Sequence, residues 1–192
     1  MKRTNVLKKI WMEETALQKS LSVVFRFPEV EFSLTELSQK AGVTKSTAHR
    51  LLPKLLHYEI IKLEKKTTVF KIMANIGSFE YTKRKIIHNL NMVYQSGIVE
   101  FLDAALSHPQ AILLFGSFRK GDDISTSDVD IAVETLEDTE TQTAHVKGLE
   151  GFEAFFGRKV QILLFNRKKV DINVFNNMAN GTVLSGFLEV KP

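Results

Sequence analysis

The chain has 192 residues, of which 44% are hydrophobic and 25% charged, so it can form one large domain or two small ones. It contains no cysteine, which excludes disulfides and thiolate metal sites and fits the cytoplasm. The first residues carry charge without an apolar core, and no apolar run is long enough to cross a bilayer. We therefore expect a cytoplasmic protein with neither a signal peptide nor a membrane partner.

The net charge of +4 is unevenly distributed along the chain. Residues 1–75 hold 14 Lys and Arg against 7 Asp and Glu, a net charge of +7, whereas residues 76–192 have a net charge of −3. A basic first part followed by a mildly acidic second part indicates two modules with different partners. We expect an α+β protein of two domains.

The first elements in chain order are three helices. The first of them has the apolar spacing i, i+4, i+7 and i+8, formed by Leu17, Leu21, Val24 and Phe25. Ser33 and Glu36 fit a capping box at the start of the second helix. Gly42 supplies a left-handed turn after it, and Thr44 is the expected N-cap of the third helix.

A basic hairpin is predicted after the third helix. The strand-like runs are Ile60–Leu63 and Val69–Ile72, with Lys65 and Lys66 in the connection between them. This order of helices, glycine turn and hairpin resembles the winged helix-turn-helix domains of bacterial and archaeal transcription regulators. The resemblance implies a domain over residues 1–75 that binds double-stranded DNA.

The exposed face of the third helix is expected to read DNA. In the major groove, bases and phosphates would be contacted by Lys45, Ser46, His49, Arg50 and Lys54. Lys65 and Lys66 would reach backbone phosphates or the minor groove. The alternative is a solvated basic helix in a protein-interaction domain. Pro53 removes the hydrogen bond to the carbonyl of His49, so we expect it to shorten or tilt this helix.

A helical linker is expected over residues 76–97, and the second module over residues 98–192. In the second module, apolar runs typical of strands alternate with apolar patterns typical of helices. Strands are predicted at 111–115, 129–134 and 160–165, and helices at 140–156 and 172–179. This alternation indicates an α/β layer structure with a small mixed sheet.

A glycine-serine loop and two aspartates form the most informative stretch, FGSFRKGDDISTSDVDIAVE, residues 115–134. Gly116 lets the backbone approach a phosphate, and Ser117 adds a donor at the start of a helix. Asp128 and Asp130 point to one side of the following strand. Their repulsion at about 4 Å is on the order of 4 kcal/mol, and Mg²⁺ would relieve it. The alternative is an edge strand with two solvated aspartates.

The pattern Gly-Ser, three residues, Gly, a short loop and Ser-Asp-x-Asp resembles the minimal nucleotidyltransferase domain of the polymerase-beta-like superfamily. The likeness extends over residues 98–188. It implies that a nucleoside triphosphate is bound by Gly116, Ser117, Lys120 and Ser127. It further implies that Asp128 and Asp130 are the catalytic residues and ligate Mg²⁺.

Gln161 departs from that family pattern, which has a third acidic residue on the next strand. Three hypotheses remain. The chain is a DNA-binding transcription regulator, acting as a homodimer, whose nucleotide/Mg-binding domain has doubtful catalytic competence. It is an active nucleotidyltransferase whose acceptor is a small molecule or a protein, such as the toxin-type partner of an antitoxin. Or its second domain is a dimerisation scaffold.

Overall fold

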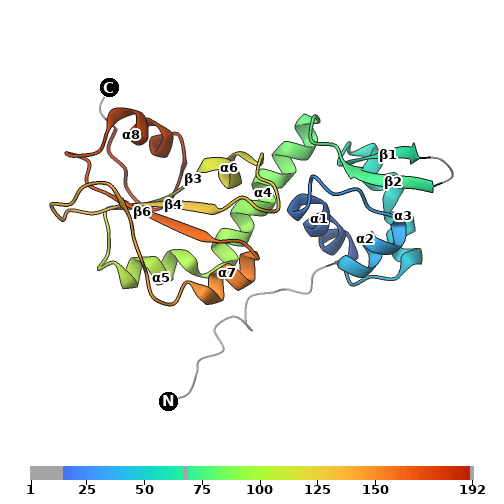
Figure 1. Cartoon of the computed structure of the whole chain (residues 1–192), viewed down its shortest axis with the longest axis horizontal. Coiled ribbons are helices and arrows are strands. Elements are labelled where there is room, and N and C mark those ends of the chain that lie inside the picture. The colour runs from blue at the N-terminus through green and yellow to red at the C-terminus, as the bar shows by residue number, and fades with distance from the viewer. Residues whose placement is uncertain (1–14, 67–68, 191–192) are drawn as a thin grey trace, which may run out of the picture. The chain divides into compact units, whose positions relative to one another are not determined.

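The computed structural model describes residues 15–66 and 69–190 (Figure 1). The chain divides into two compact units, residues 1–88 and 89–192. Their boundary falls inside one helix, α4 (Phe79–Ser96). The division into residues 1–75, 76–97 and 98–192 stays a prediction. In the described part of the chain, we find no helix with the length and apolar character that a bilayer crossing needs.

The first unit contains a three-helix arrangement followed by a hairpin. Its elements are α1 (Ala16–Arg26), α2 (Leu34–Lys40), α3 (Lys45–His57), β1 (Ile61–Lys66) and β2 (Val69–Ala74). The two strands are antiparallel, and Phe32 adds an isolated bridge to Ile72. This is the element order of a winged helix-turn-helix, as the sequence predicts.

The helices of this unit begin where their caps predict. Ser33 Oγ accepts a hydrogen bond from the Glu36 amide at 3.2 Å, and Glu36 Oε2 accepts one from the Ser33 amide at 2.6 Å. Thr44 Oγ1 accepts from the Thr47 amide at 3.1 Å, which caps α3. Gly42 has φ +61°, so the turn between α2 and α3 takes the left-handed conformation expected of it.

Nine apolar residues pack α2 and α3 together. All nine are buried or half-buried, namely Leu34, Leu37, Ala41, Val43, Ala48, Leu51, Leu52, Leu55 and Leu56. Helix α3 runs through Pro53 for 13 residues, so the proline does not shorten it, and a tilt at this position stays a prediction. One expectation about this unit was wrong. Lys65 and Lys66 belong to β1, where they pair with Phe70 and Val69, because the strand is longer than its apolar residues indicate. The turn, residues 67–68, and the side chain of Lys66 lie outside the described residues.

The second unit is built on a mixed five-stranded sheet. Besides the end of α4, its elements are α5 (Ile98–Ala105), β3 (Ala111–Phe115), α6 (Gly116–Lys120), β4 (Val129–Glu134), β5 (Gln142–Thr143), α7 (Glu150–Phe156), β6 (Val160–Phe165), α8 (Ile172–Ala179) and β7 (Thr182–Gly186). The strand order is β5-β6-β4-β3-β7. Strands β4 and β6 are parallel, and the other neighbours are antiparallel.

Apolar side chains fill both faces of this sheet. Helices α5 and α7 lie along one face and α8 along the other (Figure 1). Alternate residues of β4 therefore enter different cores: Val129 and Ile131 pack on the α5 side, and Ala132 packs with Met178 of α8. Asp130 lies two residues before Ala132, so it shares the α8 side of the sheet.

The predicted helix over residues 140–156 was wrong for most of its length. Only α7, Glu150–Phe156, is helical, and Gln142–Thr143 forms β5 at the edge of the sheet beside β6. Gly148, with φ +98°, interrupts the segment, and the threonines before it favour extended backbone. Strand β7 was also missed, because Asn180-Gly181 ends α8 and only five residues of strand follow.

Candidate functional site

The glycine-serine loop and the aspartates meet at one corner of the sheet. Phe115, the last residue of β3, pairs with Asp130 of β4, and the chain then turns into α6. Gly116 makes this turn with φ +73°. A Cβ at this position would lie 2.2 Å from Asp130 Oδ2. A side chain at position 116 would therefore be strained by the left-handed backbone and would force the Asp130 carboxylate to shift.

Asp128 and Asp130 form a half-buried pair of carboxylates. Asp128 lies just before β4 and Asp130 within it. Burial raises the pKa of Asp130 above its ordinary value, and the negative charge of Asp128 raises it further. The structure therefore holds two oxygen-donor groups in a position where both being ionised is unfavourable. A divalent cation fits such a site, because it compensates the repulsion and prefers oxygen ligands.

The start of α6 is open to an anion. Its first residues are Gly116 and Ser117, and Phe115 at the N-cap position supplies no side-chain hydrogen bond. The first amides of a helix have no partner within the helix, so they attract a phosphate oxygen. Among the polar side chains of α6, Ser117 and Arg119 are half-buried and Lys120 is exposed to solvent.

Ser127 has a structural contact in the loop before the aspartates. Its Oγ accepts a hydrogen bond from the Ile124 amide at 3.0 Å, and its own amide donates to the Ile124 carbonyl at 3.0 Å. These two bonds close the turn that precedes Asp128. A role for Ser127 in nucleotide binding stays a prediction.

A buried polar network that the sequence reasoning missed anchors the same loop. Arg158 Nη2 lies 2.8 Å from Asp123 Oδ2, and its Nη1 donates to the carbonyls of Ile124 and Ser127. Asn89 Nδ2 donates to Asp123 Oδ1 and to the Phe118 carbonyl, both at 2.8 Å. The sequence offered one signal for this network, the acidic Asp123 inside the motif. Its partners Asn89 and Arg158 lie far away along the chain, so local patterns do not reveal them.

Gln161 is the direct neighbour of Asp130 across the sheet. The parallel register of β4 and β6 pairs these two residues, and the Gln161 side chain is exposed. Asp128 and Gln161 both line a cavity of about 660 Å³, which His145, Lys147 and Lys159 also line. Across residues 15–66 and 69–190, no group of three or more His, Cys, Asp or Glu could hold a metal ion. The position opposite Asp130 in the strand register thus carries a neutral amide rather than a third carboxylate.

The DNA-reading residues predicted on α3 share its exposed surface. Solvent reaches the side chains of Lys45, Ser46, His49, Arg50 and Lys54. Lys65 is exposed on β1. The structure thus leaves these side chains outside the core of the first unit.

Comparison with models of protein families identifies a domain in each part of the chain. Residues 97–186 match the family described as Polymerase beta, Nucleotidyltransferase, and residues 28–62 match the IclR helix-turn-helix domain. The chain thus joins a segment similar to a helix-turn-helix DNA-binding domain to a segment similar to the polymerase beta nucleotidyltransferase domain, which confirms the predicted pair. This family generally uses a nucleotide substrate and a divalent metal. No curated protein and no solved structure matches the chain.

The contact between Gly116 and Asp130 can be tested with a matched pair of glycines. Gly116→Ala and Gly97→Ala each force alanine into the left-handed region, at about 1–2 kcal/mol, but nothing lies within 4 Å of the Cβ position of Gly97. We expect Gly116→Ala to lower the free energy of unfolding by about 1–3 kcal/mol more than Gly97→Ala. Urea denaturation measures both. Equal losses would mean that Asp130 does not restrict the loop.

The carboxylate pair predicts a pH-dependent stability. The folded-state pKa of Asp130 is raised, so its ionised form destabilises the metal-free protein above that pKa. Asp130→Asn should therefore raise the melting temperature at pH 7. The gain should shrink as the pH falls through the raised pKa and vanish below the unfolded-state value, 3.8.

Thermal unfolding in a chelating buffer at pH 7 and below pH 3.8 gives this comparison. Asp122→Asn, which removes an exposed carboxylate from the same unit, is the control and should change neither curve. An Asp130→Asn protein that is no more stable than wild type at pH 7 would contradict the repulsion.

Proposed function

We propose that this chain is a DNA-binding transcription regulator whose nucleotidyltransferase domain binds a nucleoside triphosphate with Mg²⁺ and turns it over poorly. The observation that carries the proposal is the pairing of Gln161 with Asp130. A glutamine amide is neutral, so it neither takes a proton from an attacking hydroxyl nor adds negative charge for a second metal ion.

The residues at the corner of the sheet suit triphosphate binding. Asp128 and Asp130 would hold Mg²⁺, which supplies charge neutralisation for phosphate oxygens. The amides at Gly116 and Ser117 would bind phosphate oxygens, and Lys120 would offset their remaining charge. The position of Gly116 supports the assignment, because this residue lies against the Asp130 carboxylate.

DNA would be read by α3 and the hairpin. Lys45, Ser46, His49, Arg50 and Lys54 would enter the major groove, and Lys65 and Lys66 would reach the backbone. A homodimer would present two such helices to half-sites about one helical turn apart. We propose the cytoplasm as the location, since DNA and nucleotide are both present there.

The regulator proposal predicts that nucleotide binding changes DNA affinity. DNA binding would be measured with and without ATP, CTP or GTP plus Mg²⁺, in wild type and in Asp128→Asn/Asp130→Asn. We expect at least a fivefold change in Kd for wild type, the usual size of a coupling between two sites, and none in the variant. Asp122→Asn/Asp138→Asn removes two exposed carboxylates from the same unit and should behave like wild type.

Two results would contradict this proposal in different ways. If calorimetry detects no nucleotide binding, the sensor role is wrong. If nucleotide binds but wild type and Asp128→Asn/Asp130→Asn hold DNA equally under all conditions, the second unit is better explained as a dimerisation scaffold.

An active nucleotidyltransferase is the second candidate, and the cavity beside Gln161 favours it. A volume of about 660 Å³ next to Asp128 has room for an acceptor. The acceptor would be a small molecule or a toxin-type protein partner. Incubation with labelled nucleotide and candidate acceptors tests this function, and transfer that is lost in Asp128→Asn/Asp130→Asn would establish it.

Gln161→Asp should show whether the missing carboxylate is what limits nucleotide turnover. Restoring a carboxylate opposite Asp130 should raise nucleotidyl transfer or nucleotide hydrolysis at least tenfold, because a positioned general base contributes about 10²–10⁴ in rate. Gln161→Asn keeps an amide and is the matched control. If both variants turn nucleotide over as slowly as wild type, the missing carboxylate does not limit the reaction.

A further inference from the structure

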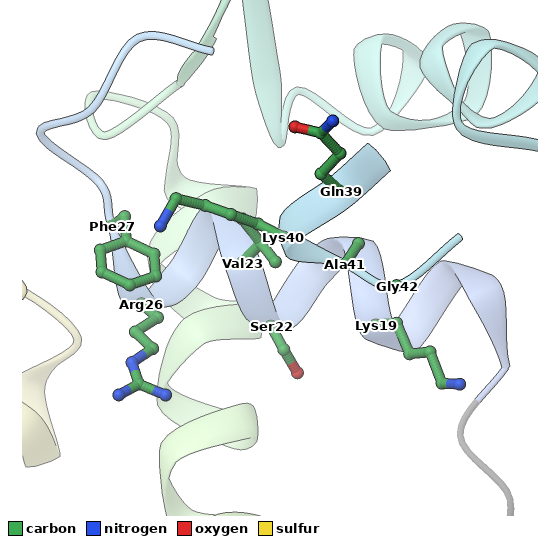
Figure 2. Close-up of a pocket in the computed structure, with 9 residues that line it drawn as sticks. All are labelled: Lys19, Ser22, Val23, Arg26, Phe27, Gln39, Lys40, Ala41 and Gly42. Atoms are coloured by element: carbon green, nitrogen blue, oxygen red, sulfur yellow. The ribbon is translucent and has the colours of Figure 1, made fainter. Parts of the chain in front are cut away.

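A second basic surface on the first unit lies between α1 and α2 and includes none of the predicted reading residues of α3. It is an open groove of about 460 Å³ (Figure 2), which we call the α1–α2 groove. Its lining residues come from α1, from the segment after it, and from the end of α2 with the following turn. They are Lys19, Ser22, Val23, Arg26, Phe27, Gln39, Lys40, Ala41 and Gly42.

Helix α1 forms one wall of the groove with a single face. Its lining residues are spaced i, i+3, i+4 and i+7, so they lie above one another along the helix. Val23 is buried and provides an apolar base. Lys19 and Arg26 stand at the two ends of this face, about 10 Å apart along the helix axis.

Phe27 contacts two of the cationic side chains, Arg26 and Lys40, at one end of the groove. Lys40 Nζ lies 4.4 Å from the centroid of the Phe27 ring, and the Arg26 guanidinium carbon lies 5.5 Å from it. Figure 2 shows the Lys40 side chain reaching along the groove to the Phe27 ring. Arg26 lies below this ring in the same view. Cation–π contacts of this kind reduce the freedom of the two side chains and so prepare them for an anion.

Positive charge lies at both ends of the groove, with Lys19 at one end and Arg26 and Lys40 at the other. Lys19, Lys40 and Arg26 are the cationic residues of the groove, and no described carboxylate lines it. Cations that converge on one point suit a small anion, whereas cations spread over about 10 Å suit successive groups of a polyanion. Ser22 and Gln39 add side chains that can donate hydrogen bonds to phosphate oxygens.

The groove also borders the turn that leads into α3. Ala41 and Gly42 line it, and the N-cap Thr44 and the first helical residue Lys45 follow directly. A backbone held in the groove would therefore run past the start of the base-reading helix. We propose that Lys19, Arg26 and Lys40 bind successive phosphates of the DNA backbone, outside the segment that α3 reads; this rests on the proposed DNA binding.

The test is the salt dependence of binding to a duplex of arbitrary sequence, because non-specific binding depends on phosphate contacts. The full chain would be compared with Lys19→Gln/Lys40→Gln by fluorescence anisotropy across a range of salt concentrations. Each lost phosphate contact lowers the slope of log K against log salt by about 0.9, so we expect a decrease of about 1.8. Lys40→Arg keeps the charge and should retain the wild-type slope.

Two single substitutions serve as controls. Lys54→Gln removes a charge from α3 and should lower the slope by about 0.9. Lys168→Gln removes an exposed charge from the second unit and should leave the slope unchanged. Thermal unfolding verifies that each variant is folded. If the double variant does not fold, Lys19→Gln alone replaces it, because this substitution leaves the Phe27 contacts intact.

The outcomes separate this proposal from the one on which it rests. A wild-type chain that binds no duplex overturns both. A wild-type chain that binds, with an unchanged slope in Lys19→Gln/Lys40→Gln and a lower slope in Lys54→Gln, overturns the groove alone. Saturable shifts of the Ala41 and Gly42 amide signals with inorganic phosphate, together with an unchanged DNA slope, would make the groove a small-anion site instead.

Discussion

The contact between Asp130 and Gly116 is the constraint on which the second unit's site depends. Strand β3 must end beside Asp130, and the chain must leave it through a left-handed residue without a side chain. This arrangement joins the open end of α6 to the two carboxylates. A short helix and two aspartates are each common alone. Here the register of β3 and β4 brings them to the same corner of the sheet, and together they define a candidate site.

The loop between α6 and β4 is fixed independently of any ligand. Arg158 and Asp123 are an ion pair buried almost completely, with 3% and 0% of their side chains exposed, and Asn89 donates to the same carboxylate. Breaking a buried pair by removing one partner usually costs about 3–5 kcal/mol, so this anchor is stiff. This anchor fixes the loop that leads into Asp128 and Asp130, so the two carboxylates are held near each other despite their repulsion.

Local patterns allowed most of this architecture to be predicted. The capping box at Ser33 and the motif from Gly116 to Asp130 depend on neighbouring residues, and Gln161 was identified because the family pattern has an acidic residue on that strand. Non-local features were missed. β5 exists because it pairs with β6, the Arg158 network joins distant segments, and the α1–α2 groove forms only when two helices pack. Periodicity within one segment carries no information about such partners.

We propose that the second unit binds a nucleotide through one metal ion on Asp128 and Asp130, because the residue opposite Asp130 is the neutral Gln161. The most direct measurement counts metal ions: titration of the chain with Mn²⁺ in the presence of a non-hydrolysable triphosphate, followed by the paramagnetic signal of free Mn²⁺. One bound ion per chain, absent in Asp128→Asn/Asp130→Asn, is the predicted result. Two bound ions of similar affinity would contradict the account, because they would mean that Gln161 does not impair the second metal site.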